Sequence, residues 1–200
     1  PRIVGETGGK DFVIAHPECD RQGLLVALLR GAFEYQGQKC SAASRAYIPQ
    51  TVWAAISDDL CSEIGKIRMG DARDFSNFMT AVIDQRAFDK ITGYIERARG
   101  RDCCEVIVGG GSDDSTGWFV EPTIIVTTNP TSESMTEEIF GPVLTVYLYE
   151  DDDFEDVLGL CDEASPYALT GSIFAADEAH VQRAFEALRF TAGNFYINDK

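Results

Sequence analysis

Residues 31–45, GAFEYQGQKCSAASR, form the stretch around which the rest of the chain is organised. Its first part continues an apolar helical face. Gly37 then predicts the end of that helix, because glycine costs about 1 kcal/mol in a helix interior relative to alanine. Small residues beside Cys40 leave room for a substrate to reach its sulfur, and the adjacent Lys39 is a cation that would favour the nucleophilic thiolate. The alternative is a buried structural cysteine.

A glycine-rich stretch at residues 5–10, GETGGK, places one carboxylate ahead of the apolar run at 12–15. Glycines let the backbone come close to other groups. Glu6 could act there as a general base if burial adjusts its pKa; the alternative is an ordinary loop glutamate. The spacing excludes a phosphate loop of the G-x-x-x-x-G-K-[ST] type, which would need glycine at Val4 and a hydroxyl at Asp11.

Strand-like and helix-like segments alternate along the chain, which predicts an α/β fold with a largely parallel sheet and helices on both faces. Such sheets bind ligands beyond the carboxyl ends of their strands. Thr51 and Asp84 are expected to cap two of the helices. The expected helices are 20–35, 51–67, 84–99, 154–163 and 178–188. The expected strands are 12–15, 45–48, 105–108, 143–149, 171–175 and 194–197, with a loop or hairpin tip at 112–116 before 118–126.

Composition excludes several classes of partner. A net charge of −16 argues against nucleic acid, whose phosphates would be repelled. No window approaches 18 consecutive apolar residues, so no membrane span is expected. The acidic run at 150–156 suits the start of a helix, the alternative being an acidic partner-binding patch.

The metal-ligating residue types are scattered. The six cysteines, at positions 19, 40, 61, 103, 104 and 161, include no C-x-x-C pair. His16 and His180 stand alone in the sequence, so no zinc site is expected. Free thiols in a reducing compartment fit this pattern.

Three motifs, G-E-x-G-G-K, G-Q-K-C and E-E-I-F-G-P at residues 137–142, occur in this order. They resemble the three signature segments of the NAD(P)-dependent aldehyde dehydrogenase superfamily, and the 34 positions from Glu6 to Cys40 fit its base-to-nucleophile spacing. Finer segments resemble the Δ1-pyrroline-5-carboxylate dehydrogenase branch, also called L-glutamate γ-semialdehyde dehydrogenase. These segments are 37–42, 81–84, 167–171 and 192–200.

The resemblance implies a role for each motif. Cys40 would be the nucleophile, with its own N–H as an oxyanion donor, and Glu6 the base that activates water against the thioester. Glu138 would accept hydrogen bonds from the nicotinamide ribose of NAD, and Phe140 would pack near the nicotinamide. Ser41 would contact the substrate. Without the resemblance, residues 137–142 would be interpreted as a helix end broken by Gly-Pro.

The implied reaction is NAD-dependent oxidation of L-glutamate γ-semialdehyde to L-glutamate in proline degradation. Two alternatives stay open: a dehydrogenase for another aldehyde, and a non-catalytic scaffold of the same fold. Residues 1–200 would be the catalytic domain of a longer chain whose NAD-binding domain and C-terminal segment lie outside them. The expected partner is a small-molecule substrate, with a homo-oligomer at full length. The compartment would be the cytoplasm of a bacterium or the mitochondrial matrix of a eukaryote.

Overall fold

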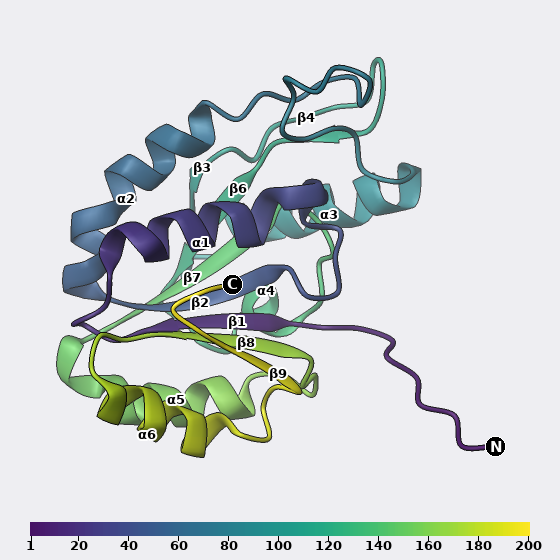
Figure 1. Cartoon of the computed structure of the whole chain (residues 1–200). Coiled ribbons are helices and arrows are strands. Elements are labelled where there is room, and N and C mark those ends of the chain that lie inside the picture. Colours follow the sequence, from purple (N-terminus) through teal and green to yellow (C-terminus); the bar gives the residue numbers. More distant parts are fainter.

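A seven-stranded sheet in the order β3-β6-β7-β2-β1-β8-β9 runs through the molecule in a computed structural model that describes residues 1–200 (Figure 1). Every neighbouring pair is parallel except β3 and β6, which confirms the predicted sheet. Its strands are β1 (Asp11–Ala15), β2 (Ala43–Pro49), β3 (Cys104–Val108), β6 (Thr123–Thr127), β7 (Val143–Tyr149), β8 (Thr170–Phe174) and β9 (Asn194–Ile197). A separate two-stranded ribbon pairs β4 (Ser112–Asp113) with β5 (Phe119–Val120).

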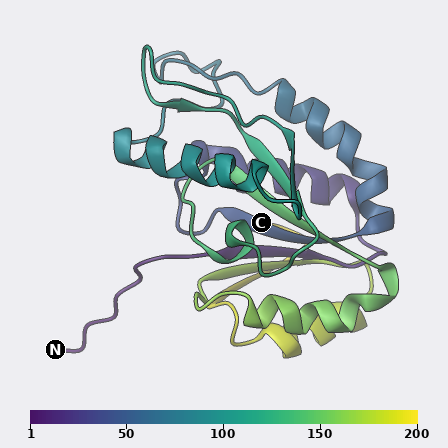
Figure 2. The same cartoon turned by 180° about the vertical axis from the view of Figure 1, so that it is seen from behind.

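Helices cover both faces of the sheet. On one face lie α1 (Arg21–Phe33) and α2 (Gln50–Gly65), and on the other α3 (Gln85–Arg99), α5 (Phe154–Glu163) and α6 (Glu178–Leu188), as Figures 1 and 2 show from opposite sides. Three short helical turns complete the chain: η1 (Glu34–Gly37), α4 (Glu133–Thr136) and η2 (Asp151–Asp153). None of the helices has the length and apolarity needed to cross a lipid bilayer.

Strand β1 shows why the sheet is buried on both sides. Successive side chains of a strand point to opposite faces. Val13 and Ala15 accordingly pack in the core beneath α1 and α2, whereas Phe12 and Ile14 pack in the core beneath α5 and α6. An almost continuous apolar run is what a parallel strand covered by helices on both faces requires.

Most predicted elements lie within two residues of their predicted bounds, and the exceptions have local causes. Asp84 caps α3 as predicted, since its carboxylate accepts from the N–H of Ala87 at 2.9 Å. The Thr51 cap is wrong, because α2 begins at Gln50, directly after β2. The N–H of Thr51 instead donates to the carboxylate of Asp151, 3.3 Å away in η2. Segment 118–126 divides into β5 and β6 around Pro122, because proline has no N–H to donate to the backbone hydrogen bonds between strands.

Three charged side chains, Lys10, Asp11 and Arg45, are buried where β1 and β2 begin. Arg45 donates to the carbonyl of Lys10 at 2.9 Å and to the hydroxyl of Tyr47 at 3.0 Å. Asp11 accepts from the N–H of Thr170 at 2.9 Å. Burial, with the neighbouring Arg45, lowers the pKa of Lys10 to about 7, and burial raises the pKa of Asp11 to about 7. Through these buried hydrogen bonds, the charged cluster fixes the first residues of β1 and β2.

Candidate active site

The three signature motifs meet at the amino ends of β1, β2 and β7, which are neighbours in the sheet. Glu6 precedes β1, Cys40 precedes β2 and Glu138 precedes β7. The expectation of a site beyond the carboxyl ends of the strands is therefore wrong. The motif glycines lie in the segments that enter these strands, and they let three backbones converge there.

Close backbone approach explains two of these glycines. A β-carbon on Gly9 would lie less than 3.0 Å from the carbonyl oxygen of Cys40, and one on Gly37 would meet the carbonyl oxygen of Gly141 in the same way. The N–H of Gly9 also donates to Oε1 of Glu138 at 2.9 Å. The glycine-rich segment thus contacts both the Cys40 motif and the Glu138 motif. The Cys40 motif in turn contacts the Glu138 motif through Gly37 and Gly141.

The turn that leads to Cys40 is left-handed for three residues. Helix α1 ends at Phe33, two residues before the predicted end at residue 35. Tyr35, Gln36 and Gly37 have φ values of 59°, 60° and 62°, a conformation that costs roughly 1–2 kcal/mol per residue with a side chain. The buried Gln36 helps to hold the turn, because its Oε1 accepts from the N–H of Thr80 at 3.1 Å.

Two residues that the sequence interpretation missed hold the site together. Gln38 accepts from the N–H of Ile83 at 2.9 Å and donates to the carbonyl of Phe140 at 3.4 Å, so it joins the Cys40 segment to two other loops. Lys90 of α3 donates to the carbonyl of Glu138 at 2.7 Å. Only its position within the G-Q-K-C motif could have drawn attention to Gln38. Nothing in the sequence pointed to Lys90.

Four of the five predicted site residues line one cavity of about 450 Å³: Glu6, Cys40, Glu138 and Phe140. The thiol-bearing residue Cys40 is exposed. Its N–H donates to no backbone carbonyl, which leaves a donor free for an oxyanion. Glu6 is exposed as well, although it lines this cavity, so the burial on which its role as a base was conditioned is absent. The N-terminus itself extends away from the body in Figures 1 and 2.

Support of the Cys40 thiolate by Lys39 stays a prediction, because the Lys39 ammonium has a carboxylate partner in the structure. The Lys39 ammonium lies 3.2 Å from the carboxylate of Glu34, which also binds Arg30 and Lys200. Lys39 therefore stabilises the turn after α1.

Ser41 lies apart from the other four predicted residues. It lines a second cavity of about 210 Å³, together with Lys39, Tyr196 and Lys200. The hydroxyl and ammonium donors of these residues suit a ligand that carries a carboxylate, but both lysines also bind Glu34, and Asp11 is part of the lining. The structure thus places Ser41 next to Cys40 in the chain but in a different cavity.

The residues of the larger cavity fit the nicotinamide end of NAD. The hydrogen bond from Gly9 uses only Oε1 of the half-buried Glu138, so Oε2 remains available to accept from a ribose hydroxyl. Phe140, at φ 60° and 37% exposed, presents its ring to the same cavity. An aromatic ring offers a flat apolar surface for a planar heterocycle.

The two histidines, expected to stand alone, are instead stacked. Their ring centroids lie 3.8 Å apart, and Glu18 brings its carboxylate so close that one ligand atom from each of the three residues falls within 4.8 Å of the others. Nδ1 of His16 accepts from the N–H of Glu18 at 3.2 Å. Burial and the neighbouring His180 lower the pKa of His16.

Comparison with known proteins identifies the class. The sequence model of the aldehyde dehydrogenase family matches residues 1–200, and the chain belongs to that family. Δ1-pyrroline-5-carboxylate dehydrogenase, mitochondrial, is 57% identical in Dictyostelium discoideum and 47% identical in Homo sapiens; each match covers 100% of the chain and 36% of the relative. The crystal structure of Δ-pyrroline-5-carboxylate dehydrogenase from Mycobacterium tuberculosis bound with NAD has a TM-score of 0.93 at 50% identity, with the same coverage. The chain therefore spans 36% of the length of these relatives.

Proposed function

We propose that the protein is an NAD-dependent dehydrogenase that oxidises L-glutamate γ-semialdehyde, the open form of Δ1-pyrroline-5-carboxylate, to L-glutamate in proline degradation. The observation that carries the proposal is the convergence of Cys40, Glu6, Glu138 and Phe140 on one cavity. The names of the relatives favour this substrate over other aldehydes.

Cys40 is the nucleophile of the proposed reaction. Its thiolate attacks the aldehyde carbon, and a thiohemiacetal with a negatively charged oxygen forms. The unpaired N–H of Cys40 is a donor for this oxygen. Removing one such donor costs about 2.7–4 kcal/mol in comparable sites. Because Gly9 and Gly37 hold the Cys40 segment by backbone contact, the donor and the sulfur are positioned together.

Glu138 and Phe140 hold the nicotinamide end of the cofactor. Oε2 of Glu138 would accept from the ribose, while the hydrogen bond from the N–H of Gly9 to Oε1 fixes the carboxylate. NAD, when bound, supplies the hydride acceptor that the protein itself lacks. The oxidised acyl group is then held on Cys40 as a thioester.

Glu6 completes the cycle. It removes a proton from water, the resulting hydroxide attacks the thioester carbon, and the C–S bond breaks to release the carboxylic acid and the thiolate of Cys40; Glu6 then gives its proton to solvent. The exposed position of Glu6 gives it direct access to water. In this proposal Ser41 contacts the polar end of the substrate from the smaller cavity.

The finer properties of the whole protein belong to the same proposal. The substrate is a small molecule, and the full-length protein is a homo-oligomer. The relatives from Dictyostelium and human are named mitochondrial. We therefore place the protein in the mitochondrial matrix if its source is a eukaryote and in the cytoplasm if it is a bacterium.

The test is turnover by the full-length protein on glutamate semialdehyde beside a series of simple aliphatic aldehydes. We expect the highest kcat/KM for the semialdehyde. Cys40→Ala should abolish turnover and keep NAD binding, whereas Cys61→Ala, at a half-buried thiol on α2, should retain turnover. A higher kcat/KM for a simple aldehyde would favour the other-aldehyde alternative, and NAD binding without any turnover would favour the scaffold.

A further inference from the structure

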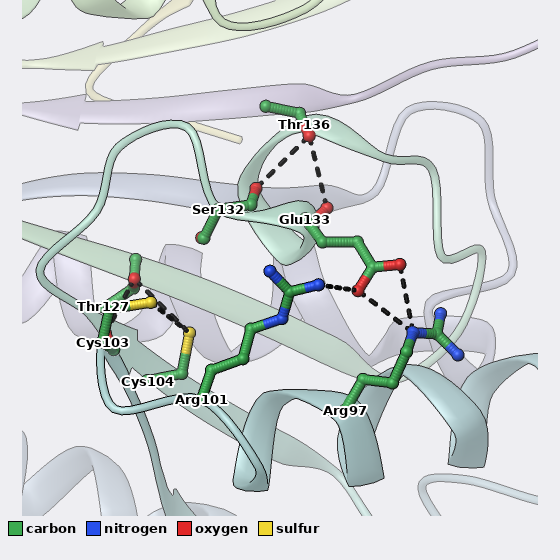
Figure 3. Close-up of polar contacts among 8 residues, drawn as sticks. All are labelled: Arg97, Arg101, Cys103, Cys104, Thr127, Ser132, Glu133 and Thr136. Atoms are coloured by element: carbon green, nitrogen blue, oxygen red, sulfur yellow. Dashed lines mark hydrogen bonds and ion pairs between the residues drawn. The ribbon is translucent and has the colours of Figure 1, made fainter.

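Two adjacent cysteines bring their sulfur atoms together at one edge of the sheet. Cys103 lies in the turn before β3, and Cys104 is the first residue of that strand. Side chains within a strand alternate between faces, but Cys103 precedes the strand. Both sulfurs consequently turn to the same side and lie 3.7 Å apart, as Figure 3 shows. Both residues are partly exposed, and both thiols are free.

One hydroxyl holds the pair in place. Thr127, opposite Cys104 on β6, has its Oγ1 3.5 Å from Sγ of Cys104 and accepts from that thiol. The same hydroxyl donates to the carbonyl of Cys103 at 3.0 Å. Arg101, which runs beside Cys104 in Figure 3, binds the carboxylate of Glu133 at 3.0 Å, so its charge is already paired. The two thiols are therefore fixed relative to each other without an ionic partner.

The sulfur separation is that of a chelating pair. Two sulfurs bound 2.3 Å from a tetrahedral ion lie about 3.8 Å apart, and the narrower angle at a pyramidal arsenic atom needs them only slightly closer, whereas a disulfide requires about 2.05 Å. We propose that Cys103 and Cys104 form a dithiol site that takes trivalent arsenicals, with both sulfurs bound to one arsenic atom.

A trivalent arsenical suits this pair better than a divalent metal ion. Metal ions bind thiolates, and burial raises the pKa of the Cys104 thiol, which keeps it protonated near neutral pH. The one group of three or more metal-ligating side chains in the structure is that of the histidines, so the thiols have no further ligands beside them. An organic arsenic oxide, R–As=O, needs no protein ligand beyond the two sulfurs. It exchanges its oxygen for two sulfurs, the two thiol protons leave with that oxygen as one water, and no element changes oxidation state.

The dithiol site and Cys40 lie at opposite ends of the strands. Cys104 pairs with Thr127, the last residue of β6, whereas the motif cavity lies at the amino ends of the parallel strands. Four residue steps along β6 separate these ends by about 13 Å. Binding at the pair therefore leaves Cys40 open, and the two sites can be told apart by substitution.

The test is retention of phenylarsine oxide by the reduced full-length protein during washing with excess 2-mercaptoethanol, read by intact mass. We expect one adduct per chain, removed by a dithiol such as 2,3-dimercaptopropanol. A second, intramolecular bond strengthens binding by roughly 10²–10⁴, so Cys103→Ser and Cys104→Ser should each weaken retention at least about 100-fold. Serine at 104 can still donate to Thr127, and thermal melting checks that both variants fold.

Two controls make the result specific. Cys40→Ser removes the exposed thiol of the motif cavity, and Cys61→Ser removes a half-buried single thiol; both variants should retain the adduct. Loss of the wild-type adduct to 2-mercaptoethanol would overturn the proposal. So would full retention by either serine variant of the pair.

Discussion

Gly9→Ala is the most direct perturbation of the candidate active site, because one methyl group would enter the space now filled by the backbone of Cys40. The new β-carbon would lie less than 3.0 Å from the Cys40 carbonyl oxygen and 3.3 Å from its carbonyl carbon. Both atoms are backbone, so no side-chain rotation relieves the contact. The Cys40 segment must move.

The size of the effect follows from that movement. Restoring ordinary van der Waals contact requires a shift on the order of 1 Å. A misplacement of 1 Å at a reacting group costs about 100-fold in rate, which corresponds to about 2.7 kcal/mol of activation free energy. We therefore expect kcat/KM for the aldehyde to fall about 100-fold in Gly9→Ala.

The assay is steady-state turnover of the full-length protein, combined with the rate of Cys40 alkylation and the melting temperature. Gly159→Ala on α5 is the matched control, since nothing lies within 4 Å of its new β-carbon. That variant should keep full activity and gain up to about 1 kcal/mol of stability. A Gly9→Ala enzyme within twofold of the wild-type kcat/KM would refute the reasoning.

Three further substitutions test two other site residues and the buried charged cluster. Glu6→Gln should give a normal burst of reduced cofactor followed by slow turnover, and loss of the burst itself would assign Glu6 to an earlier step. Glu138→Gln keeps an oxygen for Gly9 but loses the charge, so KM for NAD should rise roughly tenfold with an unchanged melting temperature; an unchanged KM would remove Glu138 from the cofactor site. Asp11 binds its proton more tightly in the folded state, so its contribution to stability is full below pH about 4 and is lost as pH rises to about 7. Asp11→Asn should abolish that decline in urea unfolding between pH 4 and 7, and an unaltered decline would place its origin elsewhere.

Much of the fold was predictable because local rules and packing agree. Helices α5 and α6 and strands β7 and β9 have the predicted bounds, and each has a clear apolar period or run. The cap of α2 was not predictable, because Asp151 supplies it from a part of the chain 100 residues away. The buried charges of Lys10, Asp11 and Arg45 were also missed, since charged residues are rarely buried without partners and the partners come from other elements.

The site residues were predicted by resemblance, but their arrangement was not. Periodicity predicts a strand without saying which of its ends will carry the site, so the amino-end location appeared only in the structure. Lys39 illustrates a second limit: adjacency in sequence to Cys40 did not decide its partner, because its flexible side chain reaches Glu34. The separate cavity of Ser41 has the same origin, as neighbouring residues of a turn can face different spaces.

The meeting of three distant motifs has a consequence for how the protein is made. The contact between Gly9 and Glu138 spans 129 residues, and β2 lies between β1 and β7 in the sheet. At a synthesis rate of about 5–20 residues per second, Cys40 leaves the ribosome roughly 5–20 seconds before Glu138 does. Throughout that interval the thiol lacks its final surroundings. The cavity forms only after β7 has joined β2, so the reactivity proposed for Cys40 should report that step, before β8 and β9 are added to the sheet.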